Sequence, residues 1–352
     1  MIYLVSRQVS EHNRIEFLKE MLEKKEIKYW HIKNKNFFSF FKRFIYILKS
    51  DVIYVLPCNW PIFTVIFSKI LRKKIINEFY YSVYDAAVND WKRYNPNSIK
   101  GKILKMFDYI ILNFSTEVIF LNNTEAERYM GMILNKKRNY KIIPLAVEER
   151  KKVKLKFFKK EREVFNLCWW GGYIPLHGLD KMIRAMKLLE NEKINFYILG
   201  TITEQERSKK YKDIISKLDL KNCFIDNTLS FSNGKLEEFL VENCDLALGG
   251  FGDSKKINEV ILNKTLDIFS MKGLCLTAYS KAMNEYFEDG KNVFYCGKTP
   301  EEIAKKILEI FHKDFKEVSN IGENSYKIYK KYFTKNHYQK EIYKVIKDIY
   351  EV

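Results

Sequence analysis

The sequence predicts an α/β protein made of two doubly wound parallel sheets. Short apolar runs of strand length alternate with amphipathic segments of helix length, which is the pattern of strand–helix–strand units. The alternation stops at a charged segment, residues 148–163, and then restarts. A chain of 352 residues, 47% of them hydrophobic, is long enough for two such domains, each with its own core.

The first half begins with an apolar strand over residues 2–6, followed by a helix over 11–25. Ser10 can cap this helix, and Ile15, Leu18 and Leu22 recur at helical spacing on one face. The same patterns then predict strands at 27–32, 51–57, 74–79, 117–121 and 140–144, and helices at 37–48, 63–72, 100–112 and from 124.

Residues 148–163 are mostly charged and offer little to a core, so we expect an exposed basic linker. After it, Thr299 and Glu302 form a capping box around Pro300, which predicts a helix start. Strands are expected at 164–170, 195–199, 223–226, 245–248 and 274–278, and helices at 178–189, 204–218, 235–241 and 263–271, with two more closing the chain. The predicted organisation is domain 1–148, linker 149–163, domain 164–330 and a helix, 331–352, that packs back on the first domain.

The net charge of +18 excludes an ordinary neutral enzyme as the default and indicates a polyanionic partner: nucleic acid, an acidic membrane surface or a phosphorylated substrate. The six cysteines include no C-x-x-C pair, so zinc ribbons and redox pairs are not expected, and a reducing compartment is the simplest interpretation. No window is apolar and long enough to suggest a transmembrane span or a signal peptide.

Three segments after predicted strands carry residues suited to phosphate and sugar chemistry. Gly171 and Gly172 precede a helix start at 178, where free N–H groups favour an anion. Gly252 lies in a second glycine-rich segment, 249–253, although both segments could be plain tight turns. In the third, Lys264 could neutralise a diphosphate and Asp267 could accept hydrogen bonds from ribose hydroxyls; the alternative is ordinary helix capping and dipole compensation.

The order of these segments resembles the GT-B glycosyltransferases, and most closely the family-4 retaining enzymes of bacterial surface-polysaccharide pathways. The motifs that carry the resemblance are S-x-Y-D at 82–85, P-L-H-G at 175–178, F-G at 251–252 and N-K-x-x-D at 263–267. They span both predicted domains. The resemblance implies two Rossmann-like domains that face each other across a cleft, which is the usual ligand site of open α/β sheets.

The resemblance also implies a function, namely retaining transfer of a sugar from a nucleotide-diphosphate sugar to a lipid-linked or cell-surface glycan, as in capsule or lipopolysaccharide assembly. The donor would lie on the second domain, held by Gly171, Gly172, His177, Gly252, Lys264 and Asp267. No cofactor and no metal would be required, because basic side chains and helix starts would stabilise the leaving diphosphate.

Two departures from the family pattern affect this expectation. Gly249 and Gly250 stand where the family has the first Glu of its acidic pair, and Asp267 replaces the second Glu. His177 replaces the usual Lys of the phosphate-binding turn, where it either donates to phosphate when protonated or only orients the turn. Sugar specificity is therefore open, and a weakened enzyme is one outcome.

On the acceptor side, Glu78 and Asp85 follow a predicted strand and could orient the acceptor hydroxyl or assist its deprotonation; Asp85 could instead be a local cap. Arg7 and Arg14 could hold a phosphorylated acceptor, with solvation on the wet face of its helix as the favoured interpretation for Arg14.

Two helical segments of the first half, 37–48 and 62–74, are aromatic, apolar and basic. This composition is typical of a contact with an anionic membrane surface, although packing on a sheet explains it equally well. We expect a cytoplasmic protein that is peripheral on the inner face of the membrane. The competing hypotheses are a nucleotide-sugar epimerase of the same architecture and a basic nucleic-acid-binding protein, which only the charge suggests.

Overall fold

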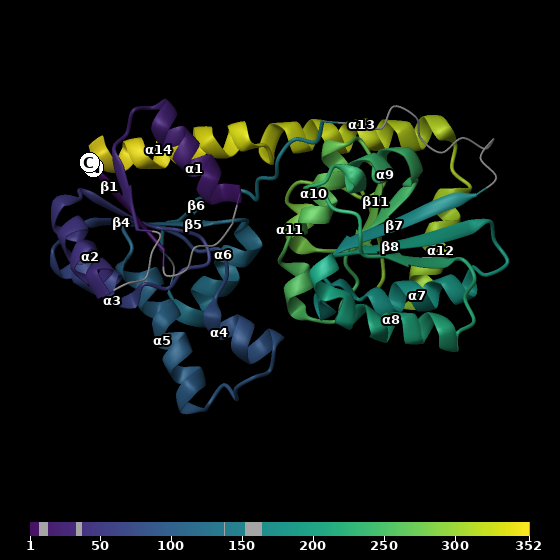
Figure 1. The fold of residues 1–352 in the computed structure, drawn as a ribbon, viewed down its shortest axis with the longest axis horizontal. Helices are drawn as coiled ribbons and strands as arrows, with labels where there is room; N and C mark the ends of the chain where they lie inside the picture. The colour runs from purple at the N-terminus through teal and green to yellow at the C-terminus, as the bar shows by residue number, and fades with distance from the viewer. Residues whose placement is uncertain (7–12, 33–36, 137, 152–163, 352) are drawn as a thin grey trace. The chain divides into compact units, whose positions relative to one another are not determined.

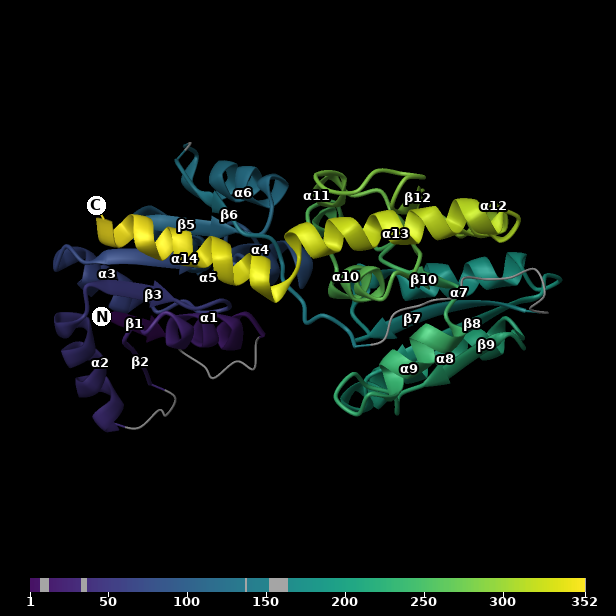
Figure 2. The ribbon, with the colours of Figure 1, turned by 90° about the horizontal axis from the view of Figure 1, so that it is seen from above.

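The computed structural model describes residues 1–6, 13–32, 37–136, 138–151 and 164–351, so Arg7 and most of the expected linker, 152–163, lie outside the described residues. The chain forms two compact units (Figures 1 and 2). Unit 1 comprises Met1–Ala146 and Lys335–Val352, and unit 2 is the continuous segment Val147–Thr334. Each unit contains a six-stranded sheet, and every strand pair in both sheets is parallel. The predicted fold class, two doubly wound α/β units, is confirmed.

The sheet of unit 1 has the strand order β2-β1-β3-β4-β5-β6, so the chain starts inside the sheet and winds to both sides. Its elements are, in order, β1 (Ile2–Val5), α1 (Asn13–Lys24), β2 (Tyr29–His31), α2 (Phe37–Lys49), β3 (Val52–Val55), α3 (Ile62–Ile70), β4 (Lys74–Glu78), α4 (Val83–Asp85), η1 (Ala86–Asp90), α5 (Ile99–Phe114), β5 (Glu117–Phe120), α6 (Asn123–Tyr129), η2 (Met130–Leu134), β6 (Lys141–Ile142) and α14 (Lys335–Glu351).

Successive side chains of each strand in unit 1 enter different cores, because they point to opposite faces of the sheet. Ile2 and Leu4 of β1 pack with α1 and α14, whereas Tyr3 and Val5 pack in the core beneath α2, α3, α5 and α6. The last helix, α14, therefore covers the same face as α1, and Figure 2 shows the two running over that face.

Unit 2 has the strand order β12-β11-β10-β7-β8-β9, the same winding from a central first strand. Figure 1 shows α7 and α8 on one face of its sheet and α9 and α10 on the other. Its elements are β7 (Phe165–Gly171), η3 (Pro175–His177), α7 (Leu179–Leu188), β8 (Ile194–Gly200), η4 (Ile202–Glu204), α8 (Gln205–Lys217), β9 (Cys223–Asp226), α9 (Lys235–Asn243), β10 (Leu246–Leu248), η5 (Lys255–Asn258), α10 (Asn263–Ser270), β11 (Cys275–Ala278), α11 (Lys281–Asn284), β12 (Phe294–Cys296), α12 (Pro300–Phe311) and α13 (Phe315–Tyr332).

Within the described part of the chain, no helix combines the length and the apolar character needed to cross a bilayer.

Candidate functional site

Two loops of unit 2 meet at the carboxyl ends of neighbouring strands. The turn after β7 and the loop after β10 lie backbone to backbone: the Phe251 N–H donates to His177 O (2.9 Å) and the Gly252 N–H donates to Leu176 O (3.2 Å). A Cβ on Gly252 would lie 2.4 Å from Leu176 O, and a Cβ on Gly178, whose φ is +64°, would lie 2.6 Å from the Phe251 carbonyl carbon. These glycines are therefore needed for the close approach of the two loops to each other.

Gly171 and Gly172 stand at the start of the first loop. Gly171 has a φ of +110°, and the space where its Cβ would lie is open. The carbonyl of Gly172 accepts two hydrogen bonds from its own loop, from the Ile174 N–H (2.9 Å) and from His177 Nδ1 (3.0 Å). The turn is thus stabilised by hydrogen bonds between its own residues, and the space beside Gly171 is unoccupied by other described groups.

His177 is buried in this turn, and its ring lies edge-on to Trp169 with centroids 5.5 Å apart. Burial, helped by the nearby Lys264 charge, lowers the pKa of His177 to about 2. The imidazole is therefore neutral at physiological pH, with Nδ1–H donating to Gly172 O. Of the two roles expected from the sequence, this geometry fits the orienting role and does not supply a protonated donor.

A further buried group of the site is Lys264, in the first turn of α10. Its side chain is buried, and its Nζ lies 4.0 Å from the centroid of the Trp169 ring. Among the described residues this Nζ has no hydrogen-bond partner. Burial lowers the pKa of Lys264 well below its ordinary value. The Asp267 carboxylate attracts this ammonium, but no described group accepts a hydrogen bond from it, so an anion placed beside Nζ would stabilise it further.

Asp267 lies one turn further along α10 and is also buried. It forms an ion pair with Arg150, and Trp170 Nε1 donates to its other oxygen at 3.5 Å. The Arg150 guanidinium also stacks on Phe231, 3.6 Å from the ring centroid. The sequence prediction placed Arg150 in an exposed linker, and this was wrong, because its charge is paired inside unit 2 and its side chain is 15% exposed. The sequence of the charged segment 148–163 contains no feature that distinguishes this arginine from its charged neighbours.

Gly249 and Gly250 stand where the glycosyltransferases that the sequence resembles have a Glu, and a larger side chain at either position would displace its neighbours. A Cβ on Gly249 would lie 2.6 Å from Thr277 Cβ, and one on Gly250 would lie 2.6 Å from Ile257 Cδ1. The loop therefore packs around the two glycines. Of the two acidic positions in the resembling family, only the second carries an acidic side chain here, namely Asp267.

In unit 1, Glu78 ends β4 inside a closed polar network. It is 3% exposed and accepts hydrogen bonds from Arg14 Nε (2.7 Å), Tyr54 Oη (2.5 Å) and Tyr338 Oη (2.7 Å). Arg14 is fully buried and also donates to the carbonyl of Pro144 (2.7 Å), so the expectation of a solvated Arg14 was wrong. Its position was readable, because Arg14 precedes Leu18 by four residues and so shares the apolar face of α1.

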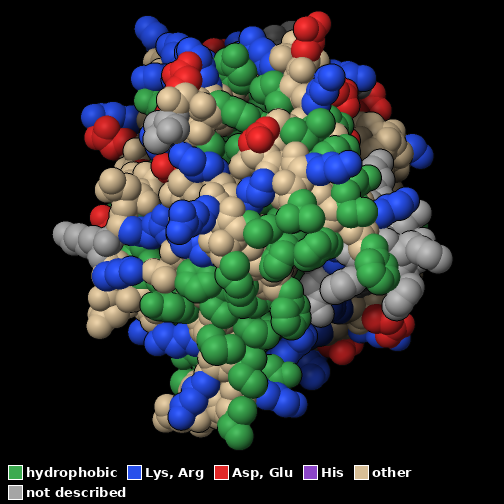
Figure 3. Space-filling view, turned by 90° about the vertical axis from the view of Figure 1, so that its left-hand side faces the viewer, with side chains coloured by type: hydrophobic (Ala, Val, Ile, Leu, Met, Phe, Trp, Pro, Cys, Tyr) green, Lys and Arg blue, Asp and Glu red, His purple; other side chains and the backbone are tan. Residues whose placement is uncertain are grey.

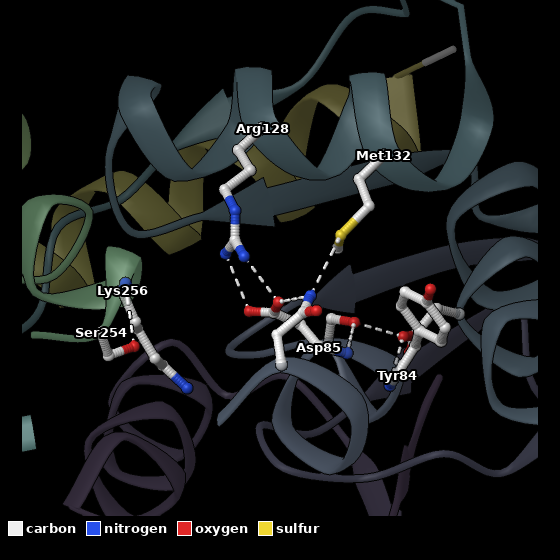
Figure 4. A network of polar contacts seen from close by, with 9 residues as sticks. Tyr84, Asp85, Arg128, Met132, Ser254 and Lys256 are labelled. Carbon is white, nitrogen blue, oxygen red and sulfur yellow. Dashed lines mark hydrogen bonds and ion pairs between the residues drawn. The ribbon is translucent and has the colours of Figure 1, made fainter. Parts of the chain in front are cut away.

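Asp85 is buried at the end of α4 and pairs with Arg128 of α6, which reaches it with both terminal nitrogens at 2.8 and 2.6 Å (Figure 4). Asn89 donates to the same carboxylate at 2.6 Å. The cap of α4 is Ser82, whose Oγ accepts from the Asp85 N–H (2.9 Å). The Asp85 carboxylate is thus held by an ion pair, and Arg128, with 20% of its side chain exposed, is its outer partner.

A third carboxylate, Asp108 of α5, was not singled out from the sequence. It accepts hydrogen bonds from Ser82 Oγ (2.5 Å) and from the Tyr84 N–H (3.0 Å), so it holds the start of α4. Burial raises the pKa of Asp108 to about 6. Its burial could have been predicted from its spacing, because it lies three and four residues before the buried Ile111 and Leu112 and so shares their face of the helix.

The described residues contain no group of three or more His, Cys, Asp or Glu side chains that could hold a metal ion. All six cysteines are free thiols.

The strand order of both units and the loops at the strand ends define the GT-B fold. Many solved structures match this chain, and several of them, including the following three, cover nearly all of it. A glycosyltransferase from Rickettsia africae has a TM-score of 0.70 at 14% identity, covering 99% of this chain and 97% of its own. Anabaena Alr3699/HepE in complex with UDP has a TM-score of 0.69 at 12% identity, covering 99% of both chains.

The third structure is a sucrose-phosphate synthase from Thermosynechococcus elongatus, with a TM-score of 0.68 at 11% identity and 99% coverage of both chains. Anabaena HepE has also been solved with UDP-glucose. No protein-family model and no curated protein sequence matches this chain. At these identities the likeness establishes the fold alone.

Proposed function

We propose that this protein is a glycosyltransferase that takes a sugar from a nucleoside-diphosphate sugar. The observation that carries the proposal is Lys264, a buried ammonium without a hydrogen-bond partner among the described residues, in the first turn of α10. A diphosphate leaving group supplies the anion that such a group lacks. The complexes of Anabaena HepE with UDP and UDP-glucose support a uridine nucleotide as the first candidate.

In this proposal the chain's own groups stabilise the charge that develops on the leaving diphosphate. Lys264 and the N–H groups at the start of α10 face the phosphates, which is an electrostatic contribution that requires no metal. Gly171 and Gly172 give the donor room at the strand end, Gly252 fixes the second loop, and His177 orients the first. Asp267 binds the ribose hydroxyls, for which it must share or release Arg150.

The finer parts of the proposal concern the acceptor and the stereochemistry. We propose retention of anomeric configuration and a lipid-linked or cell-surface glycan as acceptor, as in capsule or lipopolysaccharide assembly, with the protein peripheral on the inner face of the membrane. Asp85 and Glu78 act as positioning residues on the acceptor side. They are buried and paired, so they set the backbone after β4 and the place of Arg128.

Calorimetric titration of the full chain with UDP and UDP-glucose, beside GDP and ADP, tests the donor site. Lys264→Met should weaken UDP binding by at least about tenfold, because it removes a charge-assisted contact. The same variant should raise the melting temperature of the free protein, because it removes a buried polar group that lacks a hydrogen-bond partner among the described residues. Lys217→Met, at an exposed lysine of α8, is the matched control and should change neither quantity.

Weaker UDP binding together with a higher melting temperature would show that the Lys264 ammonium serves to bind a ligand and not to stabilise the fold. A Lys264→Met variant that binds UDP as tightly as the parent would refute the donor-site proposal. Incubation with isotopically labelled UDP-glucose without acceptor separates transfer from epimerisation, because only an epimerase would convert the sugar under these conditions.

A further inference from the structure

Three helices of unit 1 share one outer surface that is more apolar than their packing requires. Their inner sides are buried through Ile47 of α2, Val65 of α3 and Ile111 of α5. On their outer sides, Phe63 is 89% exposed, Ile99 78% and Ile70 69%. We call this surface the α2–α3–α5 face.

The exposed apolar side chains follow helical spacing, so each helix presents one stripe. Phe63 and Ile70 are seven residues apart on α3, and Ile99, Ile103 and Met106 follow the i, i+4, i+7 positions of α5. Stripes of this kind normally face a core. Here they lie on the outside, so they need a partner other than unit 1 itself.

The stripes belong to one continuous patch. The rings of Phe44 on α2 and Phe67 on α3 lie with centroids 4.8 Å apart, and Lys73 Nζ donates to Leu48 O at 2.9 Å. Helices α3 and α5 pack against each other. Figure 3 shows this end of unit 1, where hydrophobic side chains gather in one band with Lys and Arg side chains along its borders.

The exposed charge of the three helices has one sign, and the exposed acid that follows α2, Asp51, is paired with the N-terminal ammonium. The sequences of the three helices contain a single acidic residue, Asp108, and it is buried. Exposed basic side chains flank the apolar stripes on all three helices: Lys42, Lys69, Lys100, Lys102, Lys105 and, just after α3, Arg72. An apolar centre with a basic rim complements an interface that is apolar inside and anionic outside, which is the boundary of an anionic lipid bilayer.

We infer that the α2–α3–α5 face docks on an anionic membrane surface, with its exposed aromatic and aliphatic side chains in the headgroup–acyl boundary and its lysines at the phosphates. This deepens the proposed function, since it names the surface through which unit 1 would reach a membrane-held acceptor. The face includes α5 as well as α2 and α3, whereas sequence composition indicates a membrane contact only for α2 and α3.

Co-sedimentation of the full chain with vesicles tests the inference. Binding should be strong on phosphatidylcholine vesicles that contain phosphatidylglycerol and weak on phosphatidylcholine alone, and salt should reduce it, because exposed charges are screened beyond about 10 Å at 0.1 M. The variant Phe63→Ser/Ile99→Ser should lower the partition coefficient by at least about tenfold, because it removes two large apolar insertions.

Matched controls come from unit 2. Leu188→Ser/Ile202→Ser removes two apolar side chains that are also exposed, 54% and 66%, and should leave vesicle binding unchanged. For the charges, Lys100→Gln/Lys105→Gln should reduce the preference for anionic vesicles about thirtyfold, which is roughly 1 kcal/mol per lysine, whereas Lys212→Gln/Lys217→Gln on α8 should not.

Three outcomes would overturn the inference: no binding to anionic vesicles, equal loss in the unit 2 controls, or a stable dimer in light scattering that the Phe63→Ser/Ile99→Ser variant dissociates. The last would assign the face to a second copy of the chain. UDP titration needs no membrane, so a failure of vesicle binding leaves the donor-site proposal standing, and a failure of UDP binding leaves this inference standing.

Discussion

Replacing Arg14 by Met should destabilise unit 1 more than any exposed ion pair could. The side chains of Arg14 and Glu78 are 0% and 2% exposed, and their Nε and Oε2 atoms are 2.7 Å apart. Removing the guanidinium leaves Glu78 as a buried carboxylate held only by the hydroxyls of Tyr54 and Tyr338. Breaking one side of a buried pair typically costs about 3–5 kcal/mol, and we expect Arg14→Met to fall in this range.

The double variant Arg14→Met/Glu78→Gln makes this prediction sharper. It removes both charges, so the cost of the orphaned carboxylate disappears. We therefore expect the double variant to be more stable than Arg14→Met by about 2 kcal/mol. The control is Lys19→Met on the same helix, which breaks the Lys19–Glu16 pair. This pair has nearly the same length, 2.8 Å, but Glu16 is 67% exposed, so the substitution should cost less than about 1 kcal/mol.

Urea unfolding of the full chain, followed by circular dichroism and tryptophan fluorescence, gives the free energies. Two units can unfold in two steps, so the transition of unit 1 is the quantity to compare. If the free-energy changes of Arg14→Met and of Glu78→Gln, each measured alone, simply add in the double variant, the buried-pair argument is refuted. If Arg14→Met costs no more than Lys19→Met, Arg14 is not compensating a buried charge.

Three further predictions follow from the polar groups and glycines of the two units. Asp85→Asn removes the charge that holds Arg128 and should lower the rate of sugar transfer at least about tenfold while circular dichroism stays unchanged; an unchanged rate would remove Asp85 from the acceptor side. Gly252→Ala forces a Cβ within 2.4 Å of a backbone oxygen and should cost about 1–3 kcal/mol, whereas Gly131→Ala meets nothing within 4 Å and should be neutral or stabilising in the same melting experiment. Burial raises the pKa of Asp108 to about 6, so between pH 6 and 4 the folded state binds a proton that the unfolded state does not, and acidification through this window stabilises unit 1. The parent should therefore gain stability relative to Asp108→Asn as the pH falls. A stability difference that shrinks with falling pH would contradict the assignment.

Regular elements were predictable wherever apolar spacing and a cap agreed. The capping box of α12 is present in full: the Glu302 N–H donates to Thr299 Oγ1 (3.2 Å) and the Thr299 N–H donates to Glu302 Oε2 (3.0 Å). The predicted strands 223–226 and 274–278 correspond to β9 and β11. By contrast, β12, a three-residue strand at the edge of the second sheet, was not predicted.

In the candidate site, too, local sequence patterns could be recognised and contacts between distant residues could not. Lys264 and Asp267 could be singled out as candidates, because a lysine and an acid in the first turns of a helix after a glycine loop form a local pattern, and their role in donor binding stays a prediction. Their surroundings were not, because the Arg150–Asp267 pair joins residues far apart in the sequence. Local spacing also could not reveal that Glu78 would be closed in by Tyr338 of the last helix.

The position of α14 has a consequence for how the protein is made. Unit 2 is one continuous stretch and can fold as soon as it leaves the ribosome. Met1–Ala146 emerges earlier, but the side chains that cover its α1 face, among them Tyr338 and Ile342, are synthesised only after all of unit 2. The first segment to be made is therefore the last to be completed, and until then its apolar surface around Leu18 and Leu22 is open to chaperones and to aggregation.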